Sequence, residues 1–212
     1  MQSIADKTGN KFAKSGGTYD PLYASQAEHL WTYGLFLGTD NSFNLDKRIT
    51  RAEGCVLILR LQGLEETAKA KNLNCTFTDV PAWAKPYVAY AAQEGMVKGY
   101  STTEFGANDY MTADQYLTLV LRMLGYEDNV DFTWDKAADK ALSIELIGEP
   151  CHKQYLHSNL FMRDNVAVIS DNALFTAKTK SGKLLSDDLT LTTKNTGQSP
   201  YATATLKAQS NR

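Results

Sequence analysis

The sequence lacks several features that would indicate particular classes of protein. No apolar run approaches the roughly 18 residues needed to span a bilayer, and the polar stretch from Met1 to Gly17 has no apolar core of a signal peptide. We therefore expect neither membrane insertion nor a signal peptide. Lysine and arginine number 22 against 24 acidic residues, which gives a formal net charge of −2. Without a basic excess, nucleic acid is not an expected partner.

Signals of metal binding and catalysis are also scarce. The three cysteines, Cys55, Cys75 and Cys151, show no CxxC spacing, and an odd number cannot all pair within one chain. Cys151 lies near His152 and His157, but this spacing fits no common zinc pattern and no fourth ligand is evident. No serine-hydrolase elbow, phosphate-binding loop or dinucleotide fingerprint occurs. We expect no enzyme, no metal and no cofactor, and we expect Cys55 in the core.

What the sequence does contain is an internal repeat with a period of about 62 residues. The matched positions are Thr50, Glu53, Leu57, Arg60 and Gly63 in the first copy and Thr112, Gln115, Leu119, Arg122 and Gly125 in the second. Thr50 with Glu53, and Thr112 with Gln115, have the spacing of a helix capping box. The glycines are typical of helix ends. Each copy is predicted to contain a helix of about three turns between these signals.

A third, more divergent copy follows. The segment from Phe161 to Asn165 stands in the place of Ile49 to Glu53, and the apolar run after it predicts another helix that is buried on several sides. We place three repeats at 19–66, 75–128 and 130–190, after an N-terminal flank at 1–18. The tail at 191–212 is rich in threonine, serine, alanine and asparagine, and is expected to be a linker with little to bury.

These units resemble the S-layer homology family. The segment Ile49–Glu53 is similar to its ITRAE signature, Phe77–Ala84 resembles its F-x-D-V…W-A opening, and Gly95–Tyr100 resembles its glycine turn. The segment from Phe161 to Leu174 is similar to the third repeat of clostridial members. The resemblance implies an all-helical fold, a pseudo-threefold, three-pronged prism of three repeats. In that fold the second helices form a central bundle, and grooves lie between adjacent repeats.

The resemblance also implies a function. Family members are non-catalytic modules on the cell surface, here expected to be the cell wall of a Gram-positive bacterium. Their grooves bind an acidic secondary cell-wall polysaccharide, often with pyruvylated sugars, and self-association in a surface layer is a further expected interaction. The alternative is that the repeats are degenerate and serve as a protein-interaction or surface-assembly domain.

Arg51 is the first candidate glycan-binding residue. It falls at the first position of a predicted helix, where free N–H groups and the helix dipole favour an anion, and a guanidinium there can grip a carboxylate with two donors. Arg163 holds the same place in the third repeat, whereas the second repeat has Ala113. One or two working grooves are therefore expected. Thr50 and Glu53 are included in the candidate site, although they are helix caps first.

The remaining candidates come from the second repeat, and each has a structural alternative. Asp79 caps the first helix, which we favour, or accepts a hydrogen bond from a sugar hydroxyl. Trp83 packs against its own repeat or exposes an edge to the groove. Lys98 is either an ordinary exposed lysine or a second cation for the ligand. Tyr100 offers a flat face to a sugar ring, and Gly99 lets the backbone approach closely.

Overall fold

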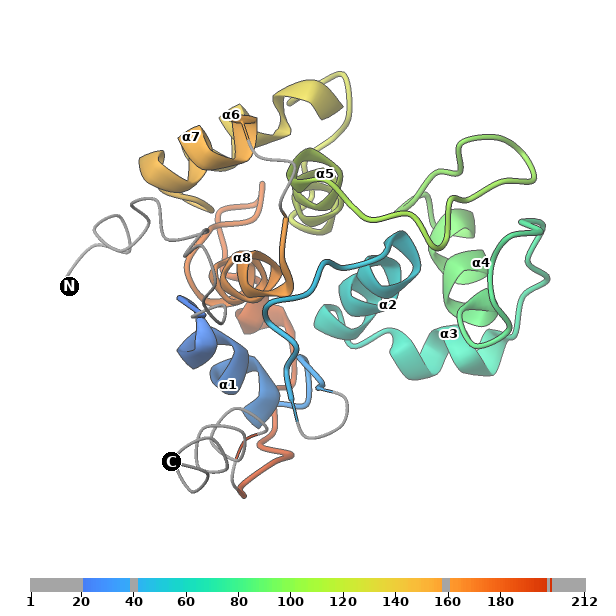
Figure 1. The fold of residues 1–212 in the computed structure, drawn as a ribbon, viewed down its shortest axis with the longest axis horizontal. Helices are drawn as coiled ribbons and strands as arrows, with labels where there is room; N and C mark the ends of the chain where they lie inside the picture. The colour runs from blue at the N-terminus through green and yellow to red at the C-terminus, as the bar shows by residue number, and fades with distance from the viewer. Residues whose placement is uncertain (1–20, 39–41, 158–160, 198, 200–212) are drawn as a thin grey trace, which may run out of the picture.

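The structure, a computed structural model, describes residues 21–38, 42–157, 161–197 and 199. This part of the chain contains eight α-helices, two short 3₁₀ turns and no strand longer than an isolated bridge (Figure 1). The all-α class predicted from the sequence is thus confirmed. The helices are α1 (Ala24–Thr32), α2 (Arg51–Leu61), α3 (Glu65–Lys71), α4 (Lys85–Gln93), α5 (Ala113–Met123), α6 (Ala137–Ser143), α7 (Glu149–His157) and α8 (Arg163–Phe175), and the 3₁₀ turns are Trp134–Lys136 and Leu185–Asp188.

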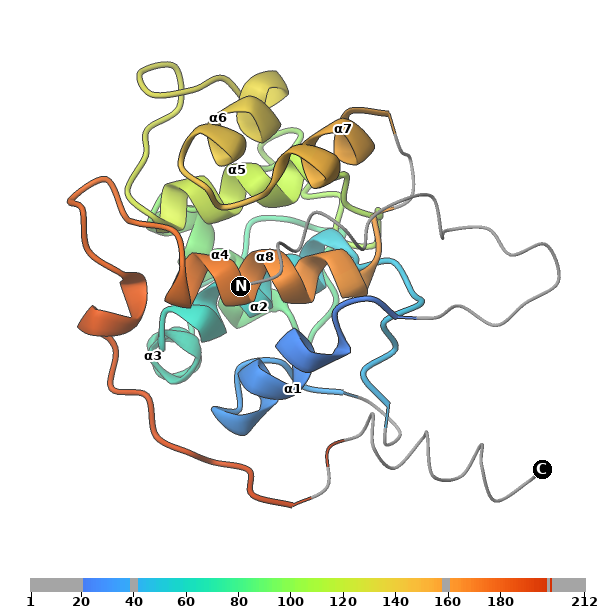
Figure 2. The ribbon, with the colours of Figure 1, turned by 90° about the vertical axis from the view of Figure 1, so that its left-hand side faces the viewer.

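Helices α2, α5 and α8 lie at the centre, and α5 contacts both of the others. Outer helices surround them, with α4 on α2, α6 on α5 and α1 on α8 (Figures 1 and 2). Each outer helix therefore packs on the central helix of a different predicted repeat, which interlocks the repeats. The pseudo-threefold symmetry of a prism and the repeat boundaries at 19–66, 75–128 and 130–190 stay predictions.

Helices α2 and α5 begin and end where their local signals lie. The Thr50 N–H donates to the Glu53 carboxylate at 2.8 Å and the Glu53 N–H donates to the Thr50 hydroxyl at 3.3 Å, and Thr112 with Gln115 repeats this arrangement at 3.1 and 3.3 Å. Gly63, just past the end of α2, has a φ of 70°, in the left-handed region that glycine adopts without strain. Both α2 and α5 contain 11 residues, about three turns, as predicted.

The core between the central helices is mostly apolar, but it contains a buried pair of hydroxyl groups. Cys55 is buried in it, as expected. Tyr116 on α5 is fully buried, and its hydroxyl lies 2.7 Å from the Ser170 hydroxyl on α8. Ser170 in turn donates to the Val166 carbonyl at 2.7 Å. Burial raises the pKa of Tyr116 well above its usual value, so the phenol stays protonated and joins α5 to α8.

A buried carboxylate fixes the start of α1. Asp164, the second residue of α8, accepts hydrogen bonds from the N–H groups of Leu22 and Tyr23 at 2.9 and 3.0 Å. These donors precede α1 and have no carbonyl partner within that helix, so the carboxylate replaces it. This contact between segments about 140 residues apart was not predicted from the sequence.

The described part of the C-terminal segment packs against α1, where a linker with little to bury was expected. The N–H groups of Lys194 and Asn195 donate to the Thr32 carbonyl at 2.8 and 3.1 Å, and the Asn195 amide donates to the Trp31 carbonyl at 2.6 Å. The last carbonyls of a helix have no partner within it, and this segment supplies donors. The segment runs below α1 in Figure 2. The expected flank at 1–18 and the tail from 200 lie outside the described residues.

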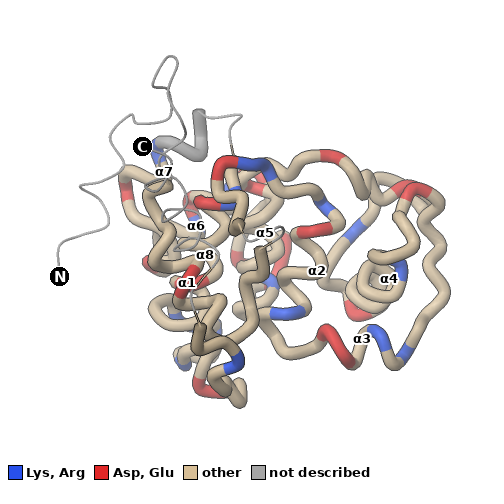
Figure 3. Tube along the Cα trace, turned by 60° about the horizontal axis from the view of Figure 1, so that its bottom comes forward, with Lys and Arg blue, Asp and Glu red and all other residues tan. Residues whose placement is uncertain are grey.

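Charge is spread over the described chain. Lysines and arginines alternate with acidic residues along the trace, without a long segment of one sign (Figure 3). Within the described ranges, no helix has the length and apolar character needed to cross a membrane.

Candidate functional site

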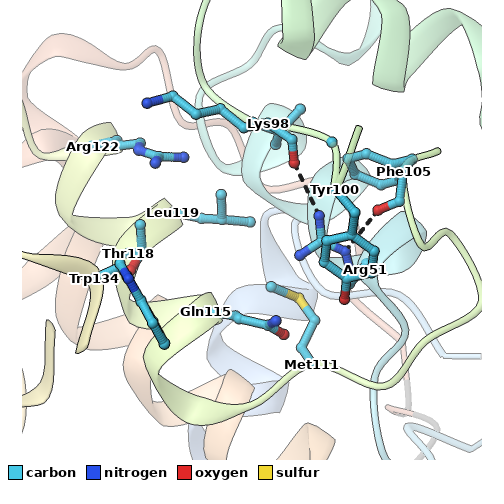
Figure 4. A pocket seen from close by; sticks show the side chains of 12 residues that line it. Arg51, Lys98, Tyr100, Phe105, Met111, Gln115, Thr118, Leu119, Arg122 and Trp134 are labelled. Atoms are coloured by element: carbon cyan, nitrogen blue, oxygen red, sulfur yellow. Dashed lines mark hydrogen bonds between the residues drawn. The ribbon is translucent and has the colours of Figure 1, made fainter. Parts of the chain in front are cut away.

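A groove of about 410 Å³ lies beside Arg51, between the start of α2, the turn after α4 and one side of α5 (Figure 4). We call it the Arg51 groove. It contains four of the nine candidate residues, Arg51, Lys98, Gly99 and Tyr100, and the other residues that line it are Val97, Phe105, Met111, Gln115, Thr118, Leu119, Arg122 and Trp134. Aromatic and aliphatic side chains form much of its wall, and the polar groups lie at separate points, as in small-molecule sites.

The Arg51 side chain is held in a fixed orientation at one end of the groove. Its Nε donates to the Phe105 carbonyl and its Nη2 donates to the Lys98 carbonyl, both at 3.0 Å (Figure 4). The guanidinium carbon lies 4.4 Å from the centre of the Tyr100 ring, within cation–π range. Among the described residues, Nη1 of Arg51 has no hydrogen-bond partner. The guanidinium is thus positioned by the fold and keeps donors for an anion.

Asp79 positions the loop that holds Arg51. Its carboxylate accepts the N–H groups of Phe105, Gly106 and Ala107 at 2.7–2.8 Å. Burial opposes ionisation, but these three donors outweigh it and hold the pKa of Asp79 below its usual value. Successive N–H groups that converge in this way form a typical carboxylate-binding turn.

The prediction that Asp79 caps the first helix of its repeat is therefore wrong. Helix α4 begins at Lys85, its N-cap residue is Ala84, and no side chain caps it. The Asp79 carboxylate lies next to a different segment, the loop before α5, where it accepts three successive N–H groups.

Exposed aromatic side chains flank the groove. Tyr100 is 52% exposed and Trp134 is 67% exposed, and both line it. Trp83 is 54% exposed, so it is not a buried residue of its repeat, and it is not part of the wall of this groove. Trp134 was missed as a candidate. Its place at the opening of the third repeat, comparable with that of Trp83 in the second, is the signal that would have found it.

Two cations, Arg122 and Lys98, line the far end of the groove, and the carboxylate of Asp128 pairs with them. Arg122 donates from Nε to Asp128 at 3.1 Å and from Nη1 to the Met96 carbonyl at 3.0 Å. This pairing holds the pKa of Asp128 below its usual value. Lys98 lies 3.5 Å from the same carboxylate, and its side chain is 71% exposed. Asp128 therefore faces two cations, Arg122 and Lys98, so one net positive charge remains for a ligand at this end of the groove.

Arg163 lies in a second site with the same pattern of contacts. Its Nε donates to the Phe43 carbonyl at 3.0 Å, its Nη2 donates to the Leu37 carbonyl at 3.1 Å, and the guanidinium lies 5.0 Å from the centre of the Phe36 ring. At the corresponding position of α5, Ala113 is buried and provides no charge. The candidates Thr50 and Glu53 form the capping box described above and are not part of the wall of the Arg51 groove.

The sequence also places Cys151, His152 and His157 close together in the third repeat. No group of three or more histidine, cysteine or acidic side chains within the described ranges is arranged to hold a metal ion. Cys151 lies 3.5 Å from the Tyr23 hydroxyl, and His152 pairs with Asp139 at 2.6 Å. The side chain of His157 lies outside the described residues.

Comparisons with known proteins relate the sequence to a known domain family. Residues 76–115 match the sequence model of the S-layer homology domain, and this segment contains Asp79 together with Lys98 and Tyr100. The chain is 33% identical over 153 residues to a "Surface layer protein" of Brevibacillus choshinensis, a match that covers 69% of this chain and 14% of the relative. It is 32% identical over 151 residues to a "Middle cell wall protein" of Brevibacillus brevis, with the same two shares.

A third relative is a "Cell surface protein" of Thermoanaerobacter kivui, which is 31% identical over 160 residues, or 73% of this chain and 20% of the relative. The chain thus spans between 14% and 20% of the length of these three relatives. The number of tandem repeats and the resemblance to clostridial third repeats stay predictions. The chain contains an S-layer homology domain at residues 76–115, and over about two thirds of its length it is similar to bacterial surface-layer and cell-surface proteins.

Proposed function

We propose that this chain is a non-catalytic module that anchors a protein to the bacterial cell wall by binding an acidic secondary cell-wall polysaccharide in the Arg51 groove. The names of its relatives place them in surface layers and cell walls, and the groove offers a chemistry that suits such a ligand. The module would act on the surface of a Gram-positive bacterium, where self-association in a surface layer is a further proposed interaction.

The observation that supports this function best is the fixed guanidinium of Arg51. It is held by two backbone carbonyls, and no described acidic side chain forms a salt bridge with it. A carboxylate on the ligand would accept from Nη1 of Arg51 and would gain a second cation in Lys98. Tyr100 and Trp134 would supply apolar faces for sugar rings. A pyruvyl ketal on an amino sugar is the proposed acidic group.

Arg163 would provide a second binding position, as predicted from its motif. Its guanidinium is held by backbone carbonyls in the same way. In the second repeat Ala113 stands where the other two repeats have Arg51 and Arg163. We therefore propose no ligand at that position.

The test is binding to sacculi of a Gram-positive bacterium, with and without prior extraction of the secondary polymer. Wild type is expected to bind only the sacculi that retain the polymer. Arg51→Ala should bind at least about tenfold more weakly, because hydrogen bonds to a charged group contribute about 1.5–3 kcal/mol. Arg48→Ala is the matched control, since Arg48 stacks on Tyr110 outside the groove. Circular dichroism would establish that both variants fold.

Two outcomes would contradict the proposal. Equal binding by wild type and by Arg51→Ala would exclude the groove as the site. If wild type fails to bind sacculi but light scattering shows a defined oligomer, the result would instead support the alternative function, a protein-interaction or surface-assembly domain.

A further inference from the structure

In the Arg51 groove and in the site of Arg163, the arginine is held by the same arrangement of two backbone carbonyls. In each, the arginine Nε donates to a phenylalanine carbonyl at 3.0 Å. In each, Nη2 donates to a second carbonyl, that of Lys98 at 3.0 Å or that of Leu37 at 3.1 Å. These bonds use backbone oxygens, so they do not depend on the side chain at the second position. Leu37 therefore stands beside Arg163 where Lys98 stands beside Arg51.

The third residue of the neighbouring central helix also differs. Gln115, at this position of α5, lines the Arg51 groove. The matching residue of α2 is Glu53, and the segment just before α2 lies against the start of α8, where the Arg163 N–H donates to the Lys47 carbonyl at 2.8 Å and Arg48 bridges to Met162. Burial lowers the pKa of Arg163, and the Glu53 carboxylate opposes that effect. A neutral amide in one site is thus replaced by a carboxylate in the other.

A further arginine near each site is already paired. Arg122 pairs with Asp128 in the Arg51 groove, and Arg60, its counterpart in the repeat, pairs with Glu65 through two hydrogen bonds of 2.7 and 3.0 Å. These pairs are neutral. Arg51 and Lys98 therefore give the Arg51 groove two net positive charges. In the other site, Glu53 balances the charge of Arg163.

We propose that the two sites recognise different parts of the polymer. The Arg51 groove holds an acidic group, the Arg163 site takes only uncharged sugar, and Lys98 and Gln115 determine this specificity. An acidic group placed at Arg163 would approach Glu53, and like charges brought together at a partly desolvated site oppose binding. This inference rests on the proposed function, because it divides that function between the two sites.

The first measurement is nitrogen-15 NMR of the full chain, in which the Nε–H signals of Arg51 and Arg163 report on each site separately. The probe is soluble secondary polysaccharide released from Gram-positive sacculi, before and after chemical reduction of its carboxyl groups. The unreduced polymer is expected to shift both signals, and reduction should abolish the shift at Arg51 alone. Loss of both shifts on reduction, or of neither, would overturn the inference.

Exchanging the side chains between the sites provides the second test. The double variant Lys98→Leu with Gln115→Glu gives the Arg51 groove the side chains of the Arg163 site. It is expected to bind the unreduced polymer roughly tenfold more weakly. Lys85→Leu removes an exposed lysine outside both sites and is the matched control. Unchanged affinity in the double variant would overturn the inference.

The converse variant, Leu37→Lys with Glu53→Gln, should make the shift at Arg163 sensitive to carboxyl reduction. Glutamine is compatible with the capping box, because Gln115 forms the same box in α5, so this variant is expected to fold. Failure of the wild type to bind any sample would overturn the proposed function and this inference with it. Binding in which both sites respond alike would overturn the inference alone.

Discussion

Removing the Asp79 carboxylate is expected to destabilise the fold and to loosen the Arg51 groove at the same time. The carboxylate accepts three successive N–H groups, those of residues 105–107, at 2.7–2.8 Å. The first of these residues, Phe105, also provides the carbonyl that accepts from Arg51 Nε at 3.0 Å. In Asp79→Ala, three donors of a buried loop lose their acceptor, and the loop that orients the guanidinium loses its anchor.

The expected loss in the free energy of unfolding follows from the number of hydrogen bonds to Asp79 and from their exposure to water. A hydrogen bond to a charged group contributes about 1.5–3 kcal/mol, but the three bonds share one carboxylate that is only partly shielded from water. We therefore expect a loss of about 2–4 kcal/mol in the free energy of unfolding. For a chain of this size, Tm should fall by about 5–15 °C. Asp79→Asn should lie between wild type and alanine, because its amide keeps one acceptor oxygen but turns an NH₂ group toward the N–H groups.

Denaturant unfolding at several pH values tests whether the ionised Asp79 carboxylate is the source of this stability. Because the pKa of Asp79 is lower in the folded state than in the unfolded chain, its contribution to stability is present above about pH 4 and is lost as the pH falls through the folded-state pKa. The difference between wild type and Asp79→Ala should therefore shrink in acid. A difference that stays constant down to pH 2.5, or a variant as stable as wild type at pH 7, would refute the reasoning.

Three further predictions concern other parts of the fold. Tyr116→Phe removes the hydroxyl that reaches Ser170 and should lower the free energy of unfolding by about 1 kcal/mol in urea titrations; no change would mean that the pair does not join α5 to α8. Gly99→Ala would place a Cβ against backbone oxygens at 2.7 Å, so it should lower both Tm and sacculus binding, and a variant that matches wild type in both would contradict the close packing there. Asn195→Ala loses the donor to the Trp31 carbonyl and should speed hydrogen exchange at the end of α1, whereas unchanged exchange would show that this contact is not needed.

The sequence predicted the central helices because their signals are local. Thr50 and Thr112 begin capping boxes, and Gly63 and Gly125 follow the helix ends, all within about one turn of the residues they affect. The pairing of outer with central helices was not predictable in this way. It depends on contacts such as those of Asp164 with the start of α1, between segments that no local pattern connects.

The candidate site was predicted in part for the same reason. Arg51 belongs to a compact motif and could be recognised alone. Asp79 was misassigned because an acid upstream of a helix resembles an N-cap, although its three partners come from a loop about 26 residues later. Gln115 and Trp134 join the groove only through the packing of α5. The repeat register matched Gln115 with Glu53, but it did not show that these two positions face different arginines.

The division between backbone and side-chain contacts explains how one frame can support two kinds of site. The arginine of each site is held through carbonyl oxygens, so replacing Lys98 by a residue such as Leu37 leaves these hydrogen bonds intact. The third residue of the helix completes the same capping box in both cases, Glu53 in α2 and Gln115 in α5. Changes at these two positions therefore alter the charge offered to a ligand at little cost to the fold. Stability and ligand preference rest on different atoms here, which lets repeats with a common fold diverge in what they bind.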